Sequence, residues 1–104
     1  KDVRRAFPQD VARDAIQAMS LVGQPGGTGY PTVADLGRPV GGKTGTTSNN
    51  YAAWFDGFTP GQLATAVGMY KGDGSLTEEN QLSNVGEYGE ITGGTVPARI
   101  WTDT

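Results

Sequence analysis

Two neighbouring apolar segments in the middle of the chain constrain its fold more than any other feature. Residues 51–58, YAAWFDGF, and residues 62–70, QLATAVGMY, are rich in aromatic and β-favouring residues, and Thr59-Pro60-Gly61 forms a compact turn signal between them. Both segments are apolar at nearly every position, which indicates strands that are covered on both faces. A third strand is expected from Val40 onward. The pattern therefore predicts a three-strand antiparallel meander.

The helical signals lie at the two ends of the chain. Apolar side chains in residues 8–22 recur every three or four positions, and Gly23 follows as a stop signal. Thr95 resembles the N-cap of a second helix, which continues toward the end of the chain. The segments 23–31 and 71–94 are expected to be irregular. With 104 residues, 17 of them Gly, the chain suffices for one small domain or part of a larger one, with a thin core.

The first apolar segment supplies the expected core residues. Trp54, Phe55 and Phe58 are typical of core packing, and we assign them no other role. Asp56 is either a strand-end or a paired residue, and nothing marks it as catalytic.

The composition excludes several classes of function. The chain has no Cys and no His, which excludes Cys and His nucleophiles and the common zinc and haem ligand sets, so no cofactor or metal is expected. A net charge of −3 without a basic cluster argues against a nucleic-acid partner. No apolar run approaches the about 20 residues of a membrane span, so any membrane anchor is expected outside this chain. A solvated loop is expected for the late acidic residues, which are Asp73, Glu78, Glu79, Glu87 and Glu90.

The tetrapeptide Lys43-Thr44-Gly45-Thr46 is the strongest candidate site. It places a cation, hydroxyl donors and an approachable backbone next to one another in a segment that favours strand. Such an edge suits a substrate that carries a carboxylate beside a reacting carbonyl. Taken alone, the tetrapeptide favours an ordinary strand lysine between turn glycines, because so short a pattern often occurs by chance.

A nucleotide site at residues 37–44 is the alternative. This segment, GRPVGGKT, matches the phosphate-binding pattern G-x-x-x-x-G-K-S/T letter for letter. That pattern requires a buried strand before it and a helix that starts at the Lys. The preceding YPTVADL is a weak strand, and the following GTTSNN contains some of the poorest helix formers.

Five blocks of the sequence resemble the transpeptidase domain of penicillin-binding proteins, and they are most similar to the bifunctional class A type. The blocks occur in the family's order and at similar spacing, and they cover nearly the whole chain. They are VARDAIQAMSLV followed by Gly27-Thr28-Gly29, then LGRPVGGKTGTT, AAWFDGFTP, QLATAVGMY and GGTVPARIW.

The resemblance implies an α+β fold in which helices flank a five-stranded antiparallel sheet, with a serine acyl-transfer site at the sheet edge. The implied enzyme is a D,D-transpeptidase that cross-links peptidoglycan stem peptides, binds β-lactams and works on the extracytoplasmic side of the bacterial cell membrane. Lys43 resembles the lysine that sets the electrostatics of the pocket. Thr44 and Thr46 resemble the hydroxyl donors to the substrate carboxylate, and the Thr46 N–H resembles an oxyanion donor. Gly45 resembles the position at which the substrate lies along the strand.

The chain departs from the family pattern in its nucleophile. None of its serines is followed three residues later by Lys, so the S-x-x-K nucleophile is missing, and Ser48-Asn49-Asn50 is expected to be a hairpin loop rather than the family's S-x-N triplet. We therefore expect residues 1–104 to be the C-terminal portion of one transpeptidase domain, with an upstream chain or half as partner. The alternative is a non-catalytic module on the same scaffold that binds peptidoglycan or a partner.

Overall fold

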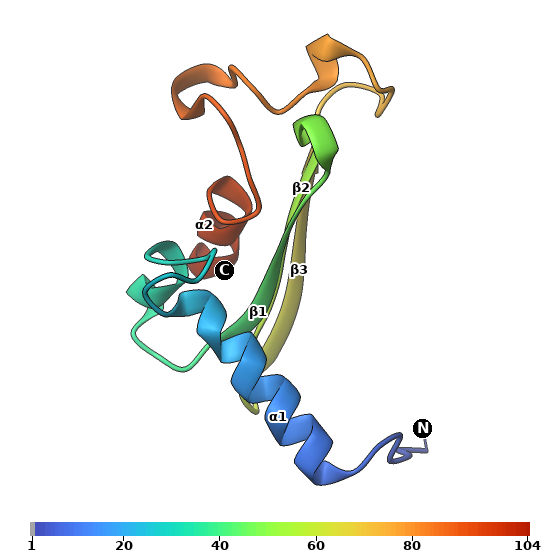
Figure 1. The fold of residues 1–104 in the computed structure, drawn as a ribbon, viewed down its shortest axis with the longest axis vertical. Coiled ribbons are helices and arrows are strands. Elements are labelled where there is room, and N and C mark those ends of the chain that lie inside the picture. The colour runs from blue at the N-terminus through green and yellow to red at the C-terminus, as the bar shows by residue number, and fades with distance from the viewer. Residues whose placement is uncertain (1) are drawn as a thin grey trace.

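The computed structural model describes residues 2–104 and shows a small α+β unit (Figure 1). Two α-helices and one three-stranded antiparallel sheet make up its regular structure, which confirms the predicted fold class at this level. In chain order the elements are α1 (Gln9–Ser20), β1 (Gly41–Thr46), β2 (Ala52–Thr59), β3 (Leu63–Tyr70) and α2 (Val96–Asp103). Five short 3-10 helices lie between them, at Leu21–Gly23 (η1), Thr32–Leu36 (η2), Ser48–Asn50 (η3), Glu78–Asn80 (η4) and Gly86–Tyr88 (η5).

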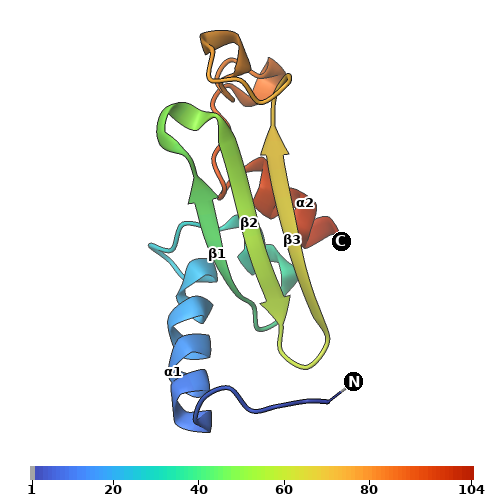
Figure 2. The same cartoon turned by 90° about the vertical axis from the view of Figure 1, so that its right-hand side faces the viewer.

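The sheet is the predicted meander, with the strand order β1-β2-β3 (Figure 2). The turn between β2 and β3 is closed by the Gln62 N–H, which donates to the Thr59 carbonyl oxygen at 3.1 Å. Gly61 has a φ of 74° in this turn, a conformation that glycine adopts without strain. Within the described residues β1 and β3 are both edge strands, so each leaves one side of its backbone unpaired by the sheet.

One face of the sheet carries the core. Phe55 on β2 is fully buried, and its ring centroid lies 5.4 Å from that of Trp101 on α2, with the two planes tilted by 60°. Aromatic pairs in such tilted arrangements contribute about 0.5–1.5 kcal/mol beyond their buried area. The remaining buried members of this cluster are Val22, Val33, Val40 and Ala98. A second, smaller cluster lies near the β1–β2 loop and contains Ala53, Leu82 and Ile91.

The opposite face of the sheet is open, which corrects the expectation that both faces would be covered. Burial alternates along β2, where Ala53, Phe55 and Gly57 are buried while Trp54 and Asp56 are exposed. Trp54 is 48% exposed, so its assignment to the core is wrong for this chain. Helix α2 packs against the face that carries Phe55, which leaves the Trp54 face without a helix of this kind over it in the described part of the chain. Of the three aromatics expected in the core, Phe55 is buried and Phe58 is partly buried.

Helix α1 lies beside β1 and extends past the end of the sheet (Figures 1 and 2). It begins after Pro8 and ends where η1 starts, as the helix signals predicted. None of its residues is buried, and its apolar side chains Val11 and Ile16 are 50% and 47% exposed. The apolar stripe that predicted the helix is therefore largely uncovered in this chain.

One local expectation is wrong, and a second is right only in position. Residues 32–36, read as part of a weak strand, form the 3-10 helix η2. Thr95 occupies the N-cap position of α2, as predicted, but its side chain makes no capping hydrogen bond. Its Oγ1 instead donates to the Thr92 carbonyl oxygen at 2.9 Å and accepts from the Thr92 N–H at 3.0 Å. A hydroxyl engaged in this backward turn has turned away from the first N–H groups of the helix.

The segment between β3 and α2 is irregular apart from η4 and η5, as expected, and its five acidic side chains are exposed. Asp73 accepts a hydrogen bond from the Ser75 N–H at 2.9 Å, and this contact lowers the pKa of the Asp73 carboxyl below its usual value. Within residues 2–104, no helix combines the length and the apolar character needed to cross a membrane.

Candidate functional site

All four residues of the candidate site lie on β1, the edge strand next to α1. One hydrogen bond shows which residues of this strand pair with β2. The Thr47 N–H, directly after β1, donates to the Ala52 carbonyl oxygen on β2 at 2.9 Å. Alternate residues of an antiparallel strand direct their N–H and C=O groups toward the partner strand. The peptide groups of Thr44 and Thr46 are therefore directed away from β2. This edge can accept an extended peptide as an added strand.

The side chains of β1 divide between the two faces of the sheet. Thr44 and Thr46 stand opposite Phe55 and Ala53 and so lie on the core side of β1. Lys43 and Gly45 stand opposite Asp56 and Trp54, on the open side. The two hydroxyls thus share one side of the strand, while the lysine starts from the other.

Lys43 bends over the free edge of the strand. Its exposed side chain places Nζ 2.7 Å from the carbonyl oxygen of Thr44, to which it donates. Since that carbonyl faces away from β2, the cation lies at the edge where an added strand would pair. The cation thus lies at the free edge of the same strand that carries the two hydroxyl residues.

The Thr44 hydroxyl is held by a residue that lies 16 positions earlier in the chain. Its Oγ1 lies 2.6 Å from the Oγ1 of Thr28, and either hydroxyl can be the donor. Thr28 stands between two glycines that pack closely on η1. A Cβ on Gly27 would collide with the Leu21 carbonyl oxygen, and the Gly29 N–H donates to the Val22 carbonyl oxygen at 3.0 Å.

The Thr46 hydroxyl is held from the other end of the chain. Its Oγ1 accepts a hydrogen bond from the Gly93 N–H at 3.0 Å. Gly93 is buried against the sheet, where a Cβ would collide with the Trp54 carbonyl oxygen and come within 2.8 Å of both the N and the O of Gly45. Only glycine permits this close approach of the two backbones.

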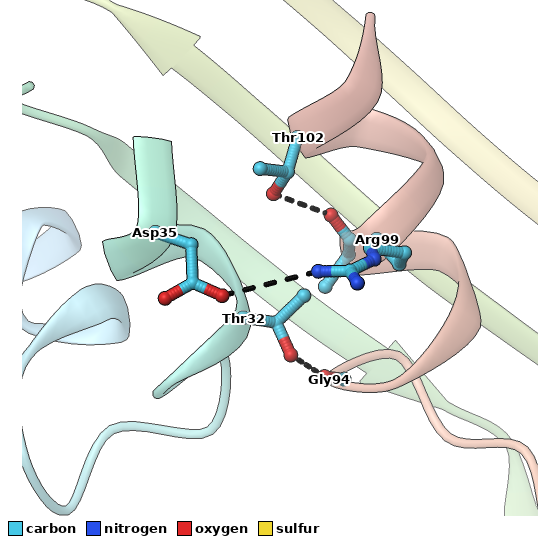
Figure 3. A network of polar contacts seen from close by, with 6 residues as sticks. Thr32, Asp35, Gly94, Arg99 and Thr102 are labelled. Atoms are coloured by element: carbon cyan, nitrogen blue, oxygen red, sulfur yellow. Dashed lines mark hydrogen bonds and ion pairs between the residues drawn. The ribbon is translucent and has the colours of Figure 1, made fainter. Parts of the chain in front are cut away.

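Figure 3 shows the contacts that join the glycine segment and α2 to η2. The Thr32 Oγ1 donates to the Gly94 carbonyl oxygen at 3.5 Å, and the Arg99 Nη1 lies 3.9 Å from the Asp35 Oδ2. The ion pair is exposed, so it contributes at most about 1 kcal/mol. Gly94 also packs on the loop of Thr28, whose carbonyl oxygen a Cβ on Gly94 would strike. The Thr28 loop, η2 and the glycine segment before α2 therefore contact one another.

The sequence predicted the four candidate residues Lys43–Thr46 on β1 but gave no role to Thr28 or Gly93. Both belong to blocks that carried the family resemblance, yet no role was assigned to either. The only signal was local: each lies beside glycines at a point where the chain needs a close backbone approach. The hydrogen-bond partner of Thr28 lies 16 positions away and that of Gly93 lies 47 positions away, and short-range patterns do not reveal such pairs.

The geometry favours binding of a carboxylate and a neighbouring carbonyl. It combines a cation and outward-directed peptide groups at the strand edge with two hydroxyls on the same strand that other segments fix in place. The phosphate-loop alternative is contradicted, because Lys43 lies within a β-strand and not at the start of a helix. In the part of the chain that the structure describes, His, Cys, Asp and Glu form no group that could hold a metal ion.

Comparison with known proteins identifies relatives of the expected class. No protein-family model and no solved structure matches the chain. Curated relatives from several bacteria match parts of it, and they are penicillin-binding proteins. This confirms the resemblance predicted from the sequence blocks.

These relatives are penicillin-binding protein 1A from different bacteria, and this chain is similar to each of them over part of its length. The protein from Vibrio cholerae is 32% identical over 80 residues, which is 74% of this chain and 10% of the relative. The protein from Neisseria meningitidis serogroup A is 41% identical over 71 residues, 67% of this chain and 8% of the relative. That from Escherichia coli is 49% identical over 49 residues, 44% of this chain and 6% of the relative. The chain thus spans a small fraction of the length of these relatives.

Proposed function

We propose that this chain supplies the KTG strand of a D,D-transpeptidase that cross-links peptidoglycan stem peptides by serine acyl transfer and reacts with β-lactams. The observation that carries the proposal is the arrangement along β1. The Lys43 cation lies at the unpaired edge of β1, and the hydroxyls of Thr44 and Thr46 share one side of the same strand, in a chain similar to penicillin-binding protein 1A.

In the proposed reaction a serine oxygen attacks the carbonyl of the penultimate D-Ala. The bond to the terminal D-Ala breaks, the departing amine takes a proton, and an acyl-enzyme ester remains. The amine of a neighbouring stem peptide then attacks this ester, and the serine recovers its proton. A β-lactam forms the same ester by ring opening and keeps its leaving group attached. The nucleophilic serine is supplied by the upstream half of the domain, since no serine of this chain precedes a lysine by three residues.

Each residue of the strand has a proposed part in this reaction. Lys43 supplies a fixed positive charge for the substrate carboxylate, and Thr44 and Thr46 donate their hydroxyl protons to it. The outward-directed N–H of Thr46 is one oxyanion donor, and the N–H of the nucleophile is the other. Gly45 adds no side chain at the point where the substrate backbone pairs with the strand.

The proposal also defines the partners and the surroundings of the chain. Residues 1–104 are the C-terminal portion of a transpeptidase domain, and an upstream chain or half completes its sheet to five strands. The ligands are stem peptides and β-lactams. The domain works on the extracytoplasmic side of the bacterial cell membrane, with an anchor outside this chain.

The experiment is covalent labelling of the intact protein with a fluorescent penicillin, followed by mass spectrometry of the labelled peptide. We expect a stable adduct on a serine of an S-x-x-K motif upstream of residue 1. An intact protein that binds stem peptide but forms no adduct would instead support the non-catalytic binding module. An adduct on any residue within 1–104 would contradict the assignment of the nucleophile.

A further inference from the structure

Thr28 contacts the candidate carboxylate site from outside the strand. Its Oγ1 lies 2.6 Å from the Oγ1 of Thr44, a short distance for a bond between two hydroxyls. We propose that Thr28 is a positioning residue, which donates its hydroxyl proton to Thr44 and thereby directs the Thr44 proton toward the substrate carboxylate. This inference rests on the proposed function and adds a residue to its substrate subsite.

The assignment of donor and acceptor follows from counting protons. A hydroxyl has one proton to donate and two lone pairs, whereas an ionised carboxylate can only accept. To bind a carboxylate, Thr44 must therefore give it the proton, and its Oγ1 is left free to accept from Thr28. The result is a chain from Thr28 through Thr44 to the carboxylate, in which each bond polarises the next. No covalent bond changes in this step.

The Thr28 backbone is fixed on both sides, so its hydroxyl is in place before substrate arrives. On one side, the N–H of Gly29 donates to the Val22 carbonyl oxygen, and the carbonyl of Gly29 accepts from the Val33 N–H, both at 3.0 Å. On the other side, Gly94 packs so closely that a Cβ there would strike the Thr28 carbonyl oxygen. Removal of the hydroxyl alone should therefore leave the loop where it is.

The second threonine of the strand shows the same arrangement with a backbone donor. The Gly93 N–H donates to the Thr46 Oγ1 at 3.0 Å, so that the Thr46 proton is the one left for a ligand. Both hydroxyls on the core side of β1 thus have a hydrogen-bond partner from another segment of the chain. For Thr46 the partner can only donate, and we infer that Thr28 plays the same part for Thr44.

The Thr28–Thr44 contact should matter for binding and little for folding. Thr28 is exposed and Thr44 is only partly buried, so water can replace the bond in the free protein. Once a substrate covers this edge, water is excluded and an undirected hydroxyl becomes costly. A role in binding therefore predicts a kinetic effect without a comparable loss of stability.

The test compares Thr28→Val, which removes the hydroxyl at nearly constant shape, with Thr28→Ser, which retains it, in the intact protein. The rate of acylation is measured with a penicillin that carries its free carboxylate and with the methyl ester of the same penicillin. We expect Thr28→Val to slow acylation by the free acid about fivefold to tenfold and to change the ester rate by less than about twofold. Thr28→Ser should stay within about twofold of wild type for both compounds. In a Thr44→Val background, Thr28→Val should have no further effect.

The outcomes separate the two proposals. A wild-type rate for Thr28→Val with the free acid overturns the positioning role, as does an equal loss with acid and ester, which marks a structural effect. A loss in Thr28→Ser as large as in Thr28→Val overturns it too, and this variant keeps the test decisive where the valine disturbs folding. Failure of the wild-type protein to react with either compound overturns the proposed function itself.

Discussion

Lys43 stands directly opposite Asp56 in the β1–β2 register, yet its ammonium group donates to the carbonyl oxygen of its own neighbour, Thr44, at 2.7 Å. An exposed ion pair across two strands would contribute at most about 1 kcal/mol, so little favours it over the carbonyl. The consequence is a cation that lies over the free edge of the sheet and leaves Asp56 to solvent. The lysine is thus available to an anionic ligand that pairs with β1.

The first prediction concerns this lysine. In the intact protein, Lys43→Ala should slow acylation by a β-lactam about 10²-fold or more, because the substrate carboxylate loses its fixed cation, whose attraction strengthens once bound substrate displaces water. Asp56→Asn is the matched control, since it removes the charge opposite Lys43 on a side chain with no proposed role, and it should change the rate by less than about threefold. Both rates are measured by stopped-flow acylation, and circular dichroism checks the fold. Acylation at the wild-type rate in a folded Lys43→Ala variant would show that β1 is only scaffold.

The second prediction concerns Gly93 and Gly45, whose backbones lie close together at β1. Gly93→Ala in the intact protein should lower the free energy of unfolding by about 1–3 kcal/mol, because its Cβ would strike the Trp54 carbonyl oxygen and crowd the Gly45 backbone. Gly45→Ala is the control. Its Cβ would meet only the Trp54 Cβ at 3.5 Å, an ordinary contact, so stability should be unchanged or slightly higher. Urea unfolding of the two variants measures the difference. Equal stability of the two variants would contradict the packing described for Gly93.

The sequence predicted the local elements well and the packing partners poorly. The hairpin of β2 and β3, helix α1 and the irregular segment before α2 follow from signals that lie within a few residues of each element, such as Pro60-Gly61 at the turn. Trp54 was assigned to the core on its apolar character, but which face of a strand is covered depends on elements elsewhere in the chain. Thr95 had the residue type of a helix cap, and its hydroxyl bonds to Thr92 instead.

The candidate site divides in the same way. Lys43 and Thr44 were identified because the candidate residues of the strand are consecutive in the sequence and form a recognisable motif. Thr28 was not, because its contact with Thr44 depends on the loop that packs on η1. A residue that acts through another residue leaves no pattern of its own in a single sequence.

The third prediction concerns assembly. The open face of the sheet presents Trp54 and Tyr70, both exposed, and helix α1 leaves its apolar side chain Ile16 exposed as well. Exposed aromatic side chains on the open face of a sheet are typical of a surface that another chain covers. Residues 1–104 expressed alone should therefore bind a hydrophobic dye and self-associate, whereas co-expression with the upstream half should give a soluble complex. Size-exclusion chromatography with light scattering distinguishes the cases. A well-folded monomer of this chain alone would be evidence against the proposed partner.

The last prediction distinguishes the hydroxyls of Thr44 and Thr46 by the hydrogen-bond partner of each. Thr46→Val should destabilise the intact protein by about 1–3 kcal/mol, because it removes the acceptor of the buried Gly93 N–H and leaves that donor without a partner. Thr44→Val should cost less than about 0.5 kcal/mol, since its partner Thr28 is exposed and can turn to water. Thr46→Ser retains the acceptor and should remain close to wild type. In acylation, Thr44→Val should nonetheless be slower by about tenfold, through the loss of one hydrogen bond to a charged group. Denaturant unfolding and acylation rates of the three variants together test this division, and equal loss of stability in Thr44→Val and Thr46→Val would refute it.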